Sequence, residues 1–334
     1  MKAIKNCIVL TPYGELHGKA VLFDEKIIDI IDENDIKDCE QIIDARGKYL
    51  SPGFVDVHVH GYLGEDTSDG SEEGIRIMAR GMLKNGVTSF LPTTMTVSWD
   101  EIEAAFENVR KLKPISQNKD FEGSEILGCH AEGPFINPSK KGAQREECII
   151  PPNVEKTLAH KDIVKIITIA PEMEGGIEYI KQLTQKSDIV VSIGHTNADF
   201  DTSLAAIKAG ASHITHLFNA MTPLNHRNPG VVGAALSSDV YTELIADCFH
   251  INPGLFSMLK TLKNDKLVLI TDCTRAGGLE DGEYSLGGQA IFVKGIECRL
   301  ADGTIAGSVL KLNNAVNNYK KHANISLYEA VNAA

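Results

Sequence analysis

The chain has 334 residues, a formal net charge of −12 at pH 7 and 43% hydrophobic residues, the composition of an ordinary globular protein. Lysine and arginine never occupy more than two successive positions, which argues against a nucleic-acid partner or an anionic membrane surface, and no run of about 18 apolar residues predicts a membrane span. Seven scattered cysteines without a Cys-x-x-Cys spacing predict reduced thiols and a cytoplasmic location.

The first fifty residues predict part of a small β-domain. Short apolar runs lie at 3–11, 18–24, 26–32 and 41–50, and no helical periodicity separates them. Residues 283–306 again show short strand-like runs separated by glycine turns, so we expect a small β-sandwich-like domain assembled from both chain ends. The last segment, 307–334, is typical of helix but lacks a terminating glycine, and we expect the chain to be incomplete there.

Residues 51–282 alternate short apolar runs with amphipathic stretches, the pattern of βαβ units. The predicted strands are 53–60, 86–94, 125–133, 164–172, 188–196, 212–220, 243–250 and 266–272. The predicted helices are 71–85, 98–112, 175–187, 199–210 and 253–264. The second helix opens with Ser98 and Glu101 at the spacing of a capping box. Eight strands alternating with helices predict an α/β fold, a TIM-like (β/α)8 barrel.

Metal-competent side chains occur at the carboxyl ends of five predicted strands. They are His58, His60, Glu132, His195, His216 and Asp272. In a TIM barrel these strand ends surround the active site, so the six groups are expected to converge on one mouth of the barrel.

Each of these residues also has an ordinary structural interpretation, because a lone histidine in a strand is more often a core or surface residue than a ligand. The His58-x-His60 pair is more specific, since residues two apart in a strand project to the same side and can share an ion. Nitrogen and oxygen ligands without thiolate favour zinc, with iron, manganese or cobalt as alternatives. The joint pattern predicts a metal-dependent hydrolase with one or two divalent ions.

The same stretches resemble a known group of enzymes. The segments PGFVDVHVHG, HAEGPF, GHTNA, THLFNAM and LITDCTRAGG are similar to the amidohydrolase superfamily and, within it, to the N-acetylglucosamine-6-phosphate deacetylase family. The resemblance implies that Glu132 is a carboxylate ligand able to bridge two ions. It implies that His195 and His216 complete one metal site, that His58 and His60 form the other, and that Asp272 is the catalytic acid and base.

The resemblance also implies the substrate and an assembly. The substrate would be N-acetyl-D-glucosamine 6-phosphate, hydrolysed to D-glucosamine 6-phosphate and acetate in amino-sugar catabolism. Substrate-binding residues would be Gln144, Asn219, Ala220, Arg227 and His250. Arg227 would reach the neighbouring subunit's site to bind the phosphate, which implies a homodimer. Gln144 stands where some members have histidine, and Cys248 stands where the family pattern has glycine.

Three alternatives stay open from the sequence. The substrate could be N-acetylgalactosamine 6-phosphate, because a single hydroxyl orientation separates the two sugars. A cyclic-amide hydrolase of the dihydroorotase type is disfavoured, since that class has a lysine in place of Glu132. A non-catalytic barrel is disfavoured as well, because all six expected metal and catalytic residues are present.

Overall fold

The computed structural model describes all 334 residues, which form two compact units. The first unit comprises Met1–Gly53 with Ile325–Asn332, and the second comprises Phe54–Asn324 with Ala333–Ala334. Each unit is described separately below.

The first unit is built on a four-stranded sheet of order β3-β2-β1-β4. The strands are β1 (Lys2–Thr11), β2 (Gly14–Phe23), β3 (Ile27–Asp32) and β4 (Gln41–Leu50), close to the four runs expected from the sequence. The first three pair antiparallel, whereas β1 pairs with β4 in parallel. Its small core contains Cys7, Val9 and Val21. The short helix α9 (Leu327–Val331), which begins with a capping box from Ser326 to Glu329, brings the end of the chain into this unit.

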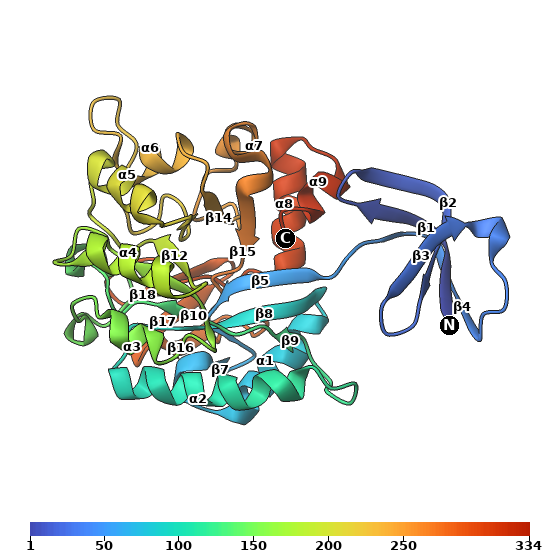
Figure 1. Ribbon diagram of the computed structural model, residues 1–334, viewed down its shortest axis with the longest axis horizontal. Helices are drawn as coiled ribbons and strands as arrows, with labels where there is room; N and C mark the ends of the chain where they lie inside the picture. Colours follow the sequence, from blue (N-terminus) through green and yellow to red (C-terminus); the bar gives the residue numbers. More distant parts are fainter. The chain divides into compact units, whose positions relative to one another are not determined.

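The second unit is a barrel of eight parallel strands with helices around it (Figure 1). The strands in spatial order are β15 (Leu267–Ile270), β14 (Tyr241–Ile245), β13 (His213–Ile214), β12 (Val190–Ile193), β11 (Val164–Ile169), β10 (Cys129–Glu132), β8 (Val87–Thr94) and β5 (Phe54–Val59). A short strand, β9 (Glu125–Ile126), adds to β8. The backbone N–H of Asp272, just after β15, donates to the carbonyl of His58 at 2.8 Å and brings the two ends of the sheet together. The predicted TIM-like barrel is confirmed.

The helices of this unit cover the outside of the barrel. They are α1 (Glu72–Leu83), α2 (Trp99–Ser116), α3 (Val154–Leu158), α4 (Gly176–Lys186), α5 (Phe200–Ala209), α6 (Gly230–Leu236), α7 (Phe256–Lys263) and α8 (Leu312–Ala323). In α1 the buried side chains of Ile75, Met78, Ala79 and Met82 recur three and four residues apart, which gives the helix one apolar face. The capping box expected at Ser98 and Glu101 is present at the start of α2. None of the helices is both long enough and apolar enough to cross a membrane.

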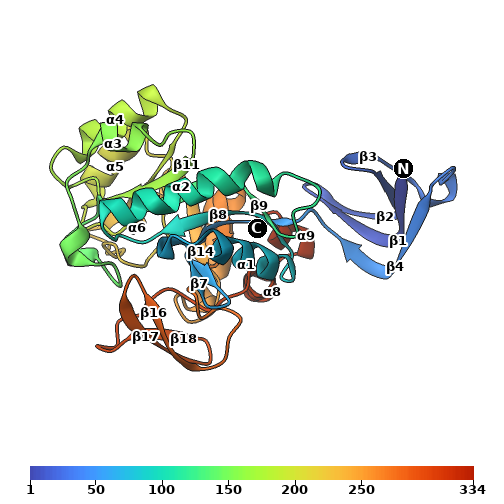
Figure 2. The ribbon, with the colours of Figure 1, turned by 90° about the horizontal axis from the view of Figure 1, so that it is seen from below.

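A three-stranded antiparallel meander follows the barrel and groups with it, not with the first unit. It consists of β16 (Gly282–Leu286), β17 (Gln289–Lys294) and β18 (Glu297–Leu300), which lie together in Figure 2. We expected these strands to resemble and join the small domain. They pair locally instead, because Gly287 and Gly288, with φ of +54° and +81°, close a tight hairpin between β16 and β17. A second small hairpin pairs β6 (Gly61–Tyr62) with β7 (Glu65–Asp66).

Candidate metal centre and active site

Six side chains expected at strand ends meet at one mouth of the barrel. Glu132 ends β10, while His195, His216 and Asp272 each lie two residues beyond the ends of β12, β13 and β15. A pocket of about 420 Å³ opens there. Of the residues predicted for the site, it is lined by His60, Glu132, Gln144, His195, His216, Asn219, Ala220, His250 and Asp272. The volume lies in the range of small-molecule sites.

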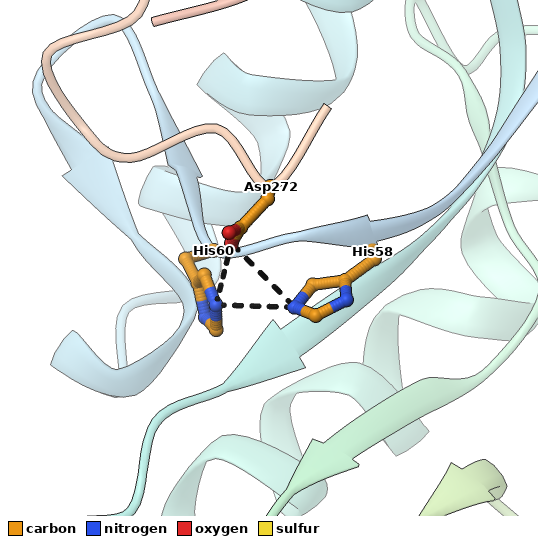
Figure 3. A group of neighbouring side chains, drawn as sticks. All are labelled: His58, His60 and Asp272. Carbon is orange, nitrogen blue, oxygen red and sulfur yellow. Dashed lines mark hydrogen bonds and ion pairs between the residues drawn. The ribbon is translucent and has the colours of Figure 1, made fainter. Parts of the chain in front are cut away.

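The first group of ligand atoms joins the His-x-His pair to Asp272 (Figure 3). The Nε2 atoms of His58 and His60 lie 3.3 Å apart. Oδ1 of Asp272 lies 3.2 Å from Nε2 of His60 and 3.6 Å from Nε2 of His58. Strand alternation explains this arrangement, because His58 lies in β5 and His60 directly follows its end, so both side chains project to the same side of the extended chain, where they are buried.

The second group joins Glu132, His195 and His216. Oε1 of Glu132 lies 3.2 Å from Nε2 of His195 and 3.1 Å from Nε2 of His216, and these two nitrogens are 3.1 Å apart. The carboxylate also reaches the first group, with Oε1 3.3 Å from Nε2 of His58 and Oε2 3.3 Å from Nε2 of His60. Glu132 therefore stands between the two groups and contacts all four histidines.

The outer ring nitrogens indicate that this cluster fits a metal. Nδ1 of His195 faces the carbonyl of Lys140 at 2.8 Å, and Nδ1 of His60 faces the carbonyl of Thr93 at 3.2 Å. A carbonyl only accepts, so each Nδ1 carries the proton and a neutral ring presents a bare Nε2 to the cluster. Lone pairs that converge on one another and on a carboxylate repel unless a cation lies among them. Two ligands bound about 2.0–2.1 Å from a tetrahedral zinc lie roughly 3.3 Å apart, close to the separations described above.

Protons supply the missing positive charge in the metal-free chain. Burial alone would lower the pKa of His60, but the hydrogen bonds and charges of Asp272 and Glu132 raise it to about 9. The pKa of Glu132 is held well below its usual value, because the neighbouring histidines outweigh the effect of burial. Metal ions and protons therefore compete for the same ring nitrogens.

The backbone is strained where three of these side chains enter the site. His195, His216 and Asp272 have φ of +47°, +27° and +50°, in a region that residues other than glycine seldom adopt. Such outliers concentrate at functional sites, where the surrounding structure holds them. Here the positive φ values accompany the sharp turns by which the chain leaves the strands.

The predicted substrate-binding residues fall into two places. Gln144 lines the pocket, but its Nε2 donates to Oε2 of Glu132 at 2.5 Å and its Oε1 accepts from the backbone of Thr96 at 2.6 Å. Nδ1 of His250 lies 2.6 Å from Oδ2 of Asp247, which fixes the ring at the pocket wall. Arg227 does not line this pocket and is exposed on the loop before α6.

The amide of Asn219 is turned toward the backbone. Its Nδ2 donates to the carbonyls of His216 and Leu217 at 3.2 and 3.3 Å, which leaves Oδ1 as the acceptor of the side chain. Ala220 follows with φ of +50° and lines the pocket with Asn219. Asn219 and Ala220 thus form the part of the pocket wall next to His216.

Two buried residues beneath the pocket were missed by sequence reasoning. His130 lies two residues before Glu132 on β10, and its Nε2 accepts a hydrogen bond from the hydroxyl of Thr168 at 2.8 Å. Glu243 lies on β14 and accepts from Nδ1 of His58 at 2.9 Å. Together with His58 they form a third group of possible ligand atoms. The available signals were the His130-x-Glu132 alternation and a lone carboxylate within the apolar run of β14.

Curated relatives are similar over most of the chain. A protein from Bacillus subtilis (strain 168) called N-acetylglucosamine-6-phosphate deacetylase is 43% identical over 85% of this chain and 72% of its own length. A protein of the same name from Lysinibacillus sphaericus is 39% identical over 98% of this chain and 85% of its own. An Escherichia coli O157:H7 protein called N-acetylgalactosamine-6-phosphate deacetylase is 34% identical over 88% and 78%.

Solved structures and a family model agree with these relatives. The crystal structure of N-acetylglucosamine-6-phosphate deacetylase from Pasteurella multocida matches with a TM-score of 0.92 and 36% identity, over 98% of this chain and 86% of that one. The model of the amidohydrolase family matches residues 49–334, which include the whole barrel and its candidate metal centre. The chain therefore belongs to the amidohydrolase family.

Proposed function

We propose that the chain is a metal-dependent deacetylase that hydrolyses N-acetyl-D-glucosamine 6-phosphate to D-glucosamine 6-phosphate and acetate. The convergence of Glu132, four histidines and Asp272 at the mouth of one pocket carries this proposal. The names of the relatives from Bacillus subtilis and Lysinibacillus sphaericus supply the substrate. Glu132 in place of a lysine argues against a cyclic-amide hydrolase, and the complete set of ligand atoms argues against a non-catalytic barrel.

His195, His216 and Glu132 would hold one divalent ion, and His58 and His60 would hold a second with Glu132 as the shared ligand. Imidazole and carboxylate donors favour zinc, with iron, manganese and cobalt as alternatives. A bound divalent ion lowers the pKa of water toward about 7 and polarises a carbonyl oxygen.

Asp272 is the residue placed to move the proton. Its carboxylate lines the pocket beside His60, where it can take a proton from the attacking water and later give it to the departing nitrogen. Burial acts to raise the pKa of Asp272, but the hydrogen bond with His60 and the charges of both histidines hold it below its usual value. The free carboxylate is thus the form that meets the substrate, as a general base requires.

The pocket wall would bind the sugar. Asn219 and Ala220 present polar atoms beside His216, and His250 is held at the wall by Asp247. Both ends of the Gln144 amide are already hydrogen-bonded to protein, so we assign it to orienting Glu132. Because Gln144 also lines the pocket, we assign it to contact with substrate as well.

Arg227 would bind the phosphate in the site of a second copy of the chain. It is exposed and outside its own pocket, which supports a homodimer in which the loop before α6 crosses between subunits. Arg227→Ala is expected to raise KM for the phosphorylated sugar about 10–100-fold, the loss of a charge-assisted hydrogen bond, and to leave kcat/KM for the unphosphorylated sugar unchanged. Steady-state kinetics on both sugars would measure this.

A mixing experiment separates action across the dimer from action within one chain. Arg227→Ala and Asp272→Asn subunits, refolded together in equal amounts, should recover about one quarter of wild-type activity, because half the dimers are hybrids with one intact site. Arg80→Ala serves as a control, since Arg80 is an exposed arginine paired only with Glu73. An unchanged preference for the phosphorylated sugar in Arg227→Ala would contradict the phosphate role.

N-acetylgalactosamine 6-phosphate is the second candidate substrate, favoured by the Escherichia coli relative.

All seven cysteines are free, which supports our placement of the enzyme in the cytoplasm.

The deciding experiment measures acetate release from both 6-phosphate sugars, with metal content determined on the same sample after loading with zinc, iron(II), manganese or cobalt. We expect metal-dependent acetate release, fastest from the glucosamine derivative. A folded, metal-loaded protein that releases acetate from neither sugar would overturn the proposed function.

A further inference from the structure

Glu243 is a fully buried carboxylate in the barrel interior, beneath the candidate metal centre. It comes from the middle of β14, where its neighbours Leu244 and Ile245 are fully buried apolar residues. Burial of a carboxylate is costly unless its oxygens accept hydrogen bonds. The side chain therefore needs specific partners, and the identity of those partners indicates its role.

One oxygen of Glu243 contacts both halves of the metal centre. Oε2 accepts from Nδ1 of His58 at 2.9 Å and from the backbone N–H of His216 at 2.9 Å. His58 belongs to the group with His60 and Asp272, whereas His216 belongs to the group with Glu132 and His195. A single carboxylate thus braces one expected ligand of each group.

The contact with His58 decides which ring nitrogen of this histidine is free. Because a carboxylate only accepts, Nδ1 carries the proton and Nε2 presents its lone pair to the other ligand atoms. His58 is fully buried, so no solvent can replace this partner. Without it, the proton is better placed on Nε2, where Glu132 lies 3.3 Å away and can accept it. A protonated Nε2 cannot bind a metal.

His216 depends less on Glu243. Its contact is made through the backbone, which the parallel pairing of β13 with β14 also positions at Ile214 and Thr242. The ion held by Glu132, His195 and His216 should therefore be less sensitive to this carboxylate than the ion held through His58.

We propose that Glu243 is a positioning residue that keeps His58 in the metal-binding tautomer and thereby determines whether the second ion is retained. This inference rests on the proposed metal centre, and it concerns ion binding rather than turnover. The other oxygen, Oε1, has no hydrogen-bond partner and lies 3.9 Å from Nε2 of His213. The bracing role thus falls to Oε2 alone.

The test compares Glu243→Gln and Glu243→Leu with wild type by zinc content after gel filtration and by competition titration. Wild type should hold two ions. Glu243→Gln keeps an oxygen that can accept both N–H groups, so it should hold the second ion about 10–100-fold more weakly, the usual effect of losing an outer partner of a metal-bound histidine. Glu243→Leu should hold one ion, with the affinity of that ion changed less than tenfold.

Thr168→Val is the matched control, because it removes buried hydrogen bonds to His130 and Thr215 in the same barrel interior, and neither partner is among the five ligands predicted from the sequence. It should retain two ions. If Glu243→Leu fails to fold, the Gln variant decides alone, and a second-ion affinity within twofold of wild type would overturn the inference. A wild type that holds a single ion would also overturn it. A wild type that holds two ions but releases no acetate would contradict the proposed function and leave this inference standing.

Discussion

Replacing Asp272 with asparagine is expected to lower kcat for deacetylation by about 10²–10⁴-fold, the range typical of a lost general acid or base. Asparagine preserves the shape of the side chain. Its amide oxygen can still face Nε2 of His60, which lies 3.2 Å from the carboxylate of Asp272. It has no basic oxygen able to take a proton from water. Metal content and KM should therefore change little, and steady-state kinetics with metal analysis on the same sample would measure the difference.

Asp66→Asn is a matched control for this change. Asp66 is also a buried carboxylate of the barrel unit, but its Oδ1 accepts a hydrogen bond from the backbone N–H of Ser68 and it does not line the pocket. We expect its kcat to stay within a fewfold of wild type. Near-normal turnover by Asp272→Asn would remove Asp272 from the catalytic role, and parallel loss of metal would instead make it chiefly a ligand.

The barrel and the convergence of its strand ends could be predicted because both depend on short-range patterns. Strand alternation places His58, in β5, and His60, just after it, on one side of the extended chain. The order of strands in a (β/α)8 barrel places Glu132, His195 and Asp272 at the same rim. Neither prediction requires knowledge of the contacts between residues that are distant in sequence. Capping residues behave similarly, since Ser98 and Glu101 act within a single helical turn.

Contacts between distant strands could not be predicted in this way. Glu243 and His58 are 185 residues apart in sequence, and only the closed barrel brings them to 2.9 Å. The strands β16 to β18 were recognisable from the sequence, but their partners depend on tight local turns outcompeting a more distant sheet.

Positive φ values were equally hidden, because residue type normally signals them only through glycine. Cys248 has φ of +67°, a conformation that glycine adopts without strain, at the position where the family resemblance implies glycine. The glycine of the family pattern therefore indicates a positive φ at this position, which the cysteine itself does not indicate.

Glu132→Gln is expected to lower the affinity for zinc by about 10²–10⁴-fold, because it removes the central charged member of a buried ionic cluster, a change worth about 3–5 kcal/mol. Glu132 is 2% exposed and contacts Nε2 of all four histidines at 3.1–3.3 Å, so both ions should be weakened together. The amide also replaces one carboxylate oxygen with an NH2 group, which cannot coordinate a metal ion.

Zinc competition titration would measure the loss, with Glu172→Gln as the control. Glu172 also accepts short hydrogen bonds, from Thr196 and Asn197, but it lies outside the ligand groups and should retain wild-type zinc content. The pattern across variants is as informative as the size of the effect. If Glu132 is a ligand shared by both ions, Glu132→Gln should lose both of them. If Glu243 positions only His58, Glu243→Leu should lose one. Glu132→Gln with two ions at wild-type affinity would show that the histidines hold the metal without a bridging carboxylate.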